Sequence, residues 1–194
     1  MMEQKTTQEK HDRAKYKLAA SIKECMKTTP VDRITVKDIV ADCGINRNTF
    51  YYYFEDMPKL IESIVEDDAE QMIQSYPTIE KFEDCLDAAI TLALTKKRAV
   101  LHIYHSANRE IYEMYLWKVC DHTINAYVSS VLQGKSVREN DIFIVKEYLS
   151  GLAFGIFSRW LKNDMNDDIR SMLSRLVKIK KGMIEEMILC CVEE

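Results

Sequence analysis

Apolar residues recur at helical spacing along most of the chain. Leu18, Ile22, Cys25 and Met26 follow the i, i+4, i+7 and i+8 pattern of one helix face, which predicts a first helix over residues 11–28. Similar patterns predict further helices over residues 58–76, 82–93, 99–107, 109–126, 141–162 and 167–192. With only 5 glycines and 3 prolines, the chain has few of the turn residues that a sandwich or barrel of strands needs. The sequence therefore predicts an all-α fold.

Residues 34–53 have the spacing of a helix-turn-helix. Thr35 and Asp38 match a capping box, in which the Thr hydroxyl accepts from the amide three residues on and the acid accepts from the Thr amide. Gly44 stands where a left-handed C-cap is needed, and Asn46 offers the N-cap of a second helix. We therefore expect two short helices joined by a tight turn.

The second of these helices has an outer face suited to DNA. Phe50 and Phe54 are four residues apart and can both point inward. The side chains left outside are Arg47, Asn48, Thr49, Tyr51 and Tyr52. A solvent-exposed face in a generic bundle usually carries Glu and Lys, whereas this face carries long or planar hydrogen-bonding groups and no acid. The pattern favours DNA reading over a plain surface.

The segment ITVKDIVADCGINRNTFYYYFEDMPKLI resembles the DNA-binding domain of the tetracycline-repressor (TetR) family. The resemblance covers about residues 11–70, and GINRNTFYYYF is its most specific part. Asn46 stands where the family commonly has Ser or Thr, a change that capping chemistry tolerates. Met57 stands where a phosphate-contacting Lys is frequent, so Lys59 is the candidate for that contact.

The resemblance implies an N-terminal three-helix helix-turn-helix domain over residues 1–76 and a larger helical-bundle domain for effector binding and dimerisation over residues 77–194. It also implies a palindromic operator as the DNA partner, because a homodimer reads two half-sites. The DNA-contacting residues that we expect are Thr35, Lys37, Arg47, Asn48, Thr49, Tyr51, Tyr52, Tyr53 and Lys59.

The helix over residues 141–162 is apolar nearly all round between Gly151 and Phe157, so it must be buried on more than one side. In TetR-like proteins the two final helices of each subunit pair into a four-helix bundle. The spacing of Gly151 and Gly155 allows close backbone approach, with tight packing inside one subunit as the alternative. The dimer interface that we expect comprises Gly151, Phe154, Gly155, Phe157, Leu173, Leu176 and Ile184.

Aromatic side chains in the second domain could line a pocket between helices. Family members generally bind an effector there, which would be a small molecule or another protein. Taken one at a time, these side chains are explained more simply as core filling. The pocket candidates are Phe82, Tyr104, Tyr112, Tyr115, Trp117, Phe143 and Tyr148.

Composition and charge narrow the function. Apolar residues make up 47% of the chain and charged residues 30%, as in ordinary folded proteins. The net charge is −4, but residues 1–60 carry 11 Lys+Arg against 9 Asp+Glu, and the remainder carries 16 against 22. A basic N-terminal region and an acidic remainder are consistent with a small DNA-binding domain followed by a larger domain that does not contact DNA. No window approaches a membrane span and no apolar leader is visible, so we expect a cytoplasmic protein without a membrane partner.

Chemistry beyond DNA binding has little support in the sequence. The 6 cysteines form no C-x-x-C pair, so neither a disulfide framework nor a zinc knuckle is expected. His102 and His105 lie close together on a helix, but no carboxylate or thiol stands at supporting spacing, and no metal is predicted. Catalytic and phosphate-binding motifs are absent, so we expect neither an enzyme nor a cofactor.

Three hypotheses remain. The leading one is a homodimeric, sequence-specific transcription regulator, usually a repressor in this family, that is controlled by an effector. The second is a helical protein-binding adaptor, or an activator working through a protein co-ligand; a missing response to salt and operator sequence would favour the adaptor. The third is a His/Cys metalloenzyme, which metal analysis would identify.

Overall fold

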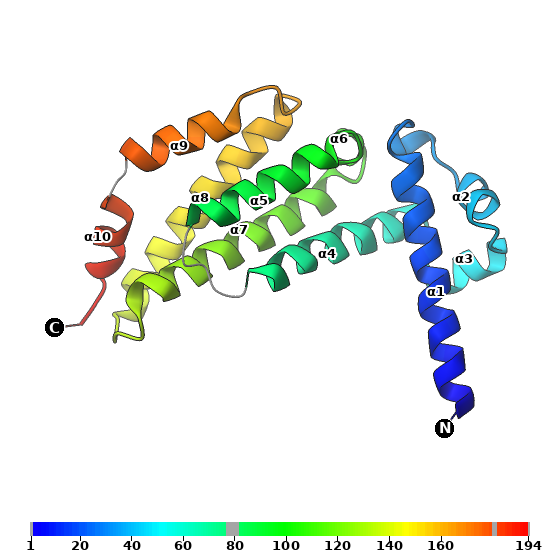
Figure 1. Cartoon of the computed structure of the whole chain (residues 1–194), viewed down its shortest axis with the longest axis horizontal. Helices are drawn as coiled ribbons and strands as arrows, with labels where there is room; N and C mark the ends of the chain where they lie inside the picture. Colours follow the sequence, from blue (N-terminus) through cyan, green and yellow to red (C-terminus); the bar gives the residue numbers. More distant parts are fainter. Residues whose placement is uncertain (1, 77–81, 180–181, 194) are drawn as a thin grey trace. The chain divides into compact units, whose positions relative to one another are not determined.

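The structure, a computed structural model, describes residues 2–76, 82–179 and 182–193, with the backbone alone for residues 2–12, 82–86, 88 and 177. Its helices (Figure 1) are α1 (Met2–Cys25), α2 (Val36–Cys43), α3 (Arg47–Tyr53), α4 (Met57–Ser75), α5 (Phe82–Thr95), α6 (Lys97–Tyr104), α7 (Arg109–Leu132), α8 (Glu139–Lys162), α9 (Ile169–Ile179) and α10 (Met183–Leu189). Over these residues there is no β-strand, only an isolated bridge between Val137 and Val192. The predicted all-α fold is confirmed. Within the described segments, no helix is long and apolar enough to span a membrane.

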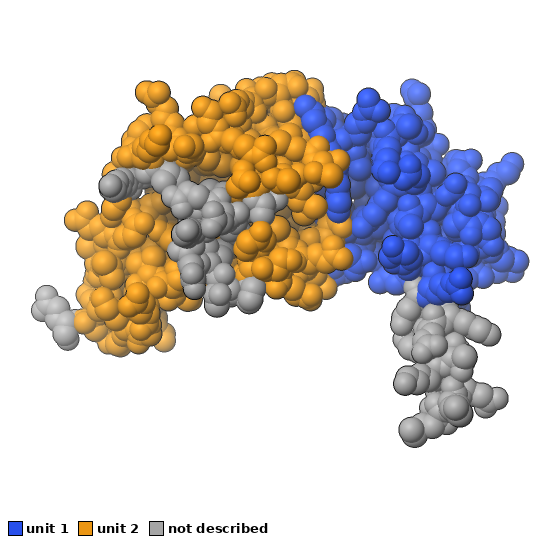
Figure 2. All heavy atoms as spheres, viewed as in Figure 1, with its two compact units in different colours: residues 1–67, 96–112 blue, residues 68–95, 113–194 orange. Residues whose placement is uncertain are grey.

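The chain divides into two compact units (Figure 2). Unit 1 comprises residues 1–67 and 96–112, and unit 2 comprises residues 68–95 and 113–194. The helix α6 therefore belongs to the same unit as the helix-turn-helix, although α5 before it belongs to unit 2. The predicted division of roles at residue 76 stays a prediction.

The helices α1, α2 and α3 of unit 1 pack around a shared core. Leu18 and Ile22 of α1 are fully buried, and they share one side of the helix because they lie four residues apart. The other buried apolar side chains of this core include Met26, Val31, Ile34, Ile39, Phe50, Phe54, Leu60 and Ile61. Burial of this apolar surface stabilises α2 and α3, which at 8 and 7 residues are too short to be stable alone.

Donors from α6 lie at the C-terminal end of α1. The last turn of a helix leaves carbonyl groups without intrahelical donors and carries a partial negative charge. Nδ1 of His102 donates to the carbonyl of Met26 at 2.8 Å, and Nη1 of Arg98 donates to the carbonyl of Lys27 at 3.5 Å. These bonds help to explain why α6 belongs to unit 1.

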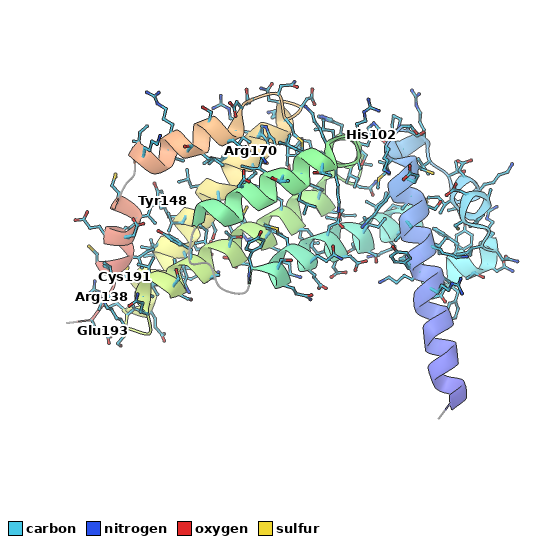
Figure 3. The ribbon with its side chains drawn as sticks, in the orientation of Figure 1. His102, Arg138, Tyr148, Arg170, Cys191 and Glu193 are labelled. Carbon is cyan, nitrogen blue, oxygen red and sulfur yellow. The ribbon has the colours of Figure 1, made fainter. Side chains whose placement is uncertain are left out.

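Unit 2 is built mainly on α7 and α8. Its largest described core cluster joins α7, α8 and the C-terminal segment through Ile124, Val128, Leu132, Ile142, Val145, Leu149, Ile188 and Cys191. The helix α9 is tied to α5 by Arg170 (Figure 3), whose Nε lies 2.7 Å from Oδ1 of Asp87 and whose Nη2 donates to Oγ1 of Thr91 at 2.6 Å.

The C-terminal segment is fastened to the residues that precede α8. The amide of Arg138 donates to the carbonyl of Cys191 at 2.9 Å, and the amide of Glu193 donates to the carbonyl of Ser136 at 3.1 Å (Figure 3). The guanidinium of Arg138 also donates to the carbonyl of Cys190. Together with the Val137–Val192 bridge, these bonds fix the chain after α10.

The largest departures from the expected helices lie near the two ends of the chain. The polar residues before His11 continue α1, which begins at Met2 and ends at Cys25. The prediction of one long helix over residues 167–192 is wrong, because α9 and α10 are separate helices. Gly182, just before α10, has φ 79° and lies in the left-handed region, which a residue without Cβ adopts at little cost. The apolar periodicity continues across this break and therefore conceals it.

Candidate nucleic-acid interface

The helix α2 begins with the predicted capping box. Oγ1 of Thr35 accepts from the amide of Asp38 at 3.3 Å, and Oδ2 of Asp38 accepts from the amide of Thr35 at 2.9 Å. The Thr35 hydroxyl also donates to the Asp38 carboxylate at 2.6 Å. This hydroxyl bond is the main reason why the pKa of Asp38 lies below its usual value, and the bond from the Thr35 amide is the second. Thr35 and Lys37 are both exposed at this helix end, where amides and the helix dipole favour phosphate.

Removal of this cap gives the first testable expectation. Thr35→Ala should lower the free energy of unfolding by about 1 kcal/mol, because an N-cap bond disappears. The pKa of Asp38 is lowered in the folded state, so the ionised carboxylate stabilises the fold above the unfolded pKa of about 3.9. That contribution is lost as the pH falls through the lower folded pKa. Thermal unfolding of parent and variant across the acid range should show a difference in stability that becomes smaller at low pH. A difference that stays constant with pH would show that the charge of Asp38 does not contribute to the effect of the cap.

The turn between α2 and α3 has the expected chemistry. Gly44 has φ 66° and ψ 29°, a left-handed conformation, and its amide donates to the carbonyl of Val40. The amide of Ile45 reaches the same carbonyl at 3.1 Å. Oδ1 of Asn46 then accepts from the amide of Asn48 at 2.8 Å and caps α3. Because both helix ends are capped, the angle between α2 and α3 is held by local bonds.

A hydroxyl that the sequence analysis did not single out joins α1 to α2. Ser21 is only 4% exposed, and its Oγ donates to Oδ2 of Asp42 at 2.6 Å and lies 3.3 Å from the carbonyl oxygen of Ile39. Ser21 could have been found from the sequence, because it lies on the apolar face between Leu18 and Ile22 and a buried hydroxyl needs a hydrogen-bond partner. The bond helps to set how α2 lies against α1.

The helix α3 is amphipathic in the predicted sense. Phe50 is fully buried and Phe54 is 5% exposed, with ring centroids 5.9 Å apart. On the other side, Tyr51 is 47% and Tyr52 is 70% exposed. Arg47 and Asn48 are also exposed, while Thr49 and Tyr53 are half-buried. The two phenylalanines anchor the helix, and its polar and aromatic face is left accessible.

One pair on this face is already organised. Nη2 of Arg47 donates to the hydroxyl of Tyr51 at 3.2 Å, and the guanidinium carbon lies 5.5 Å from the centroid of the tyrosine ring. The neighbouring rings of Tyr52 and Tyr53 meet edge to face at 5.1 Å. A guanidinium held in one place loses less freedom on binding, and arginine is the commonest reader of guanine in the major groove.

The candidate phosphate contact on α4 is occupied within the chain. Nζ of Lys59 lies 2.7 Å from Oε2 of Glu62, and this bond raises the pKa of the lysine. Oδ1 of Asp56 accepts from the amide of Lys59 at 2.9 Å and caps the helix. Met57 is half-buried. A phosphate that approaches Lys59 must therefore compete with Glu62.

The pocket candidates are divided between the two units. Tyr104 and Tyr112 belong to unit 1, and the other described candidates belong to unit 2. Phe143 is 62% and Tyr148 is 53% exposed, so both lie on the surface of the chain. Figure 3 labels Tyr148 on α8. Tyr104 and Tyr115 are buried, Trp117 is exposed, and the side chain of Phe82 lies outside the described residues. An effector pocket stays a prediction.

The expected interface residues fall into two groups. Gly151 and Gly155 are exposed, and a Cβ built on either would meet no atom within 4 Å, so neither packs tightly inside the chain. Phe154 and Phe157 are half-buried and contact Trp117 and Trp160, with ring centroids 5.5 and 6.4 Å apart. Leu173 is buried within the chain, while Leu176 and Ile184 are half-buried. Ile144, which is not among the expected interface residues, is 64% exposed on α8.

Two histidines are hydrogen-bonded to backbone carbonyl groups. Nδ1 of His102 is bonded to the Met26 carbonyl, and Nε2 of His122 lies 3.2 Å from the carbonyl of Tyr76. Among the residues whose side chains are described, no group of three or more His, Cys, Asp or Glu is placed to hold a metal ion.

These observations define a helix-turn-helix protein with an exposed recognition helix and a second helical unit. Residues 19–64 match the model of the bacterial regulatory proteins of the tetR family, and residues 80–182 match a model described as a transcriptional regulator C-terminal region of the same family. The second match alone spans more than half of the chain. The chain belongs to the TetR family of DNA-binding transcriptional regulators.

Solved structures share the fold at low sequence identity. The dihydroxyacetone kinase operon activator DhaS superposes with a TM-score of 0.70 at 15% identity, over 92% of this chain and 98% of that one. The fatty acid degradation regulator FadR from Bacillus halodurans gives a TM-score of 0.51 at 13% identity, over 93% of this chain and 94% of that one. None of the curated proteins compared with the chain matches it.

Proposed function

We propose that the chain is a homodimer that binds a palindromic operator through α2 and α3 and represses transcription until an effector binds. The exposed face of α3 is the observation that carries this proposal. Arg47, Asn48 and Tyr52 project from a helix that is capped by Asn46 and anchored by Phe50. A rigid helix with such a face can enter the major groove and read base edges.

Each predicted DNA contact takes a role from its position. Arg47, Asn48 and Thr49 in the first turn of α3 read bases, and the three tyrosines that follow reach bases or phosphates. Thr35 and Lys37 at the start of α2 hold the DNA backbone. Lys59 contributes a phosphate contact only where the phosphate displaces Glu62.

Dimerisation is supported by one face of α8. Ile144, Tyr148, Gly151 and Gly155 are all exposed and follow one another at spacings of four, three and four residues, so they lie along one side of the helix. An apolar stripe with two glycines allows a second helix to approach closely. Met172, Ile179 and Met183 add exposed apolar side chains on α9 and α10. We place the interface on these residues rather than on Leu173.

Effector control would act through α6. This helix is bonded to the end of α1 by His102 and Arg98, while the chain enters it from α5 and leaves it into α7. A small molecule or protein that shifts the helices of unit 2 therefore has a covalent route to the DNA-binding helices. DhaS is named as an operon activator, so the sign of regulation is tested separately by transcription from the operator with and without the protein.

The direct test starts with selection of bound sequences from random DNA. Arg47→Ala should then weaken binding to the selected operator by about 1–3 kcal/mol and relax the preference at one base pair. Lys37→Ala should weaken all DNA about equally and flatten the salt dependence by about 0.9 in log–log slope for each subunit, because one phosphate is no longer neutralised. Lys135→Ala, at an exposed position of unit 2, serves as the control. If the first two variants bind as the parent does, α2 and α3 are not the interface.

A further inference from the structure

Positive charge in the DNA-binding part of the chain is concentrated ahead of the helix-turn-helix. Residues 1–23 carry 6 Lys+Arg and 3 Asp+Glu, whereas residues 24–60 carry 5 Lys+Arg and 6 Asp+Glu. Affinity for DNA depends strongly on the phosphates that cations neutralise. The net charge of residues 24–60 is negative and does not attract the phosphates, whereas the net charge of residues 1–23 is positive and does.

The cations of the helix-turn-helix are also partly engaged. Lys59 is paired with Glu62 at 2.7 Å, and Arg47 donates to Tyr51 at 3.2 Å. At position 57, close to the end of α3, the chain has an uncharged methionine. Lys37 remains as an exposed lysine of this module, so phosphate contacts from another element would add substantially to its affinity for DNA.

The helix α1 offers such contacts just before its first core residue. Arg13, Lys15 and Lys17 are all exposed, and Tyr16 beside them is 73% exposed. No acidic residue occurs between positions 13 and 23. Arg13 and Lys17 lie one turn apart on one side of the helix and Lys15 lies on the other, so this turn presents cations around its circumference.

This cationic turn is rigidly joined to the helix-turn-helix. Leu18 follows Lys17 directly and is fully buried, and Ser21 one turn later is bonded to Asp42 of α2. Figure 1 shows α1 running past α2 and α3 as one continuous helix. The position of the cations relative to the recognition helix is therefore fixed by helix geometry rather than by a flexible arm.

We propose that residues 13–17 of α1 form a second DNA contact, which neutralises backbone phosphates beside the segment read by α3. This inference rests on the proposed function and adds a second set of phosphate contacts, on a different helix, to the one proposed for Lys37 of α2. The contact is independent of base sequence, because ammonium and guanidinium groups on phosphates carry no base information. Its partner is duplex DNA that extends beyond the bases contacted by α3.

The test uses the full chain and a variant with Arg13→Gln, Lys15→Gln and Lys17→Gln. A matched control carries Lys135→Gln, Lys146→Gln and Lys178→Gln, which removes the same charge from unit 2. Each protein is titrated with the selected operator over a range of salt. The α1 variant should show a log–log salt slope that is shallower by about 0.9 for each phosphate that it no longer neutralises, up to about 2.7 per subunit. The control should keep the parent slope.

A second measurement varies the DNA. Operator duplexes that end at the last base pair read by α3 are compared with duplexes longer by about one helical turn on each side. The parent should gain affinity from the added DNA, and the α1 variant should gain much less. Circular dichroism of the variant should match that of the parent, because all three side chains are exposed. An unchanged slope, or an equal gain from flanking DNA, would overturn the proposal. A parent that binds no selected operator would overturn the proposed function as well.

Discussion

An aspartate in place of Ile144 or Tyr148 is expected to split the proposed dimer into helical monomers. These side chains are 64% and 53% exposed in the single chain, so the subunit itself does not need them for folding. In the proposed dimer they would be buried against a second copy, where an unpaired carboxylate costs several kcal/mol. Monomers read one half-site at a time, and operator affinity should fall by about 10²–10⁴-fold. Sedimentation, circular dichroism and operator titration are measured together.

The choice of positions makes this experiment specific. The sequence pattern points to Phe154 and Phe157, but those rings contact Trp117 and Trp160 in the same chain, so a charge there would disturb the subunit as well. Met114→Asp on α7 is the matched control, because Met114 is 52% exposed and lies outside the proposed face. A monomeric variant that still binds the full operator tightly would contradict the link between dimer and function. A variant that remains dimeric would show that the interface lies elsewhere.

The helix-turn-helix could be predicted because its boundaries depend on neighbouring residues. Three local features set these boundaries: the bonds between Thr35 and Asp38, the left-handed Gly44 and the Asn46 cap. Each depends on residues that are close together in the sequence, so each can be recognised from the sequence alone. The inward direction of Phe50 and Phe54 follows from helical spacing in the same way. The matched family model confirms the class of protein.

The surface of unit 2 could not be predicted so closely. A helix that is apolar on several sides has more than one plausible buried face, and only its neighbours decide which one is covered. Leu173 is buried while Met172 beside it is 46% exposed, although both are apolar and adjacent. Phe143 and Tyr148 are aromatic, which suggested a pocket, yet they lie on the surface. Side-chain type indicates that burial is favourable but does not identify the partner that provides it.

Within α3, two alanine substitutions should separate folding from DNA reading. Phe50→Ala removes a fully buried ring that packs 5.3 Å from Tyr51 and 5.9 Å from Phe54. The reduced burial and the cavity together should lower the free energy of unfolding by about 3–5 kcal/mol. This is a large part of the stability of an ordinary domain, so unit 1 should unfold at a much lower denaturant concentration and DNA binding should disappear with it.

Tyr52→Ala is the matched partner, because it removes an aromatic ring that is 70% exposed from the same helix. Its free energy of unfolding should stay within about 0.5 kcal/mol of the parent value, since most of the ring lies outside the core. Its affinity for the selected operator should nevertheless fall by about 1–3 kcal/mol. Urea unfolding followed by circular dichroism gives the first quantity, and operator titration gives the second. If Tyr52→Ala destabilises the protein as much as Phe50→Ala does, the face assigned to DNA is instead part of the fold. If Tyr52→Ala leaves both quantities unchanged, Tyr52 does not contact the operator.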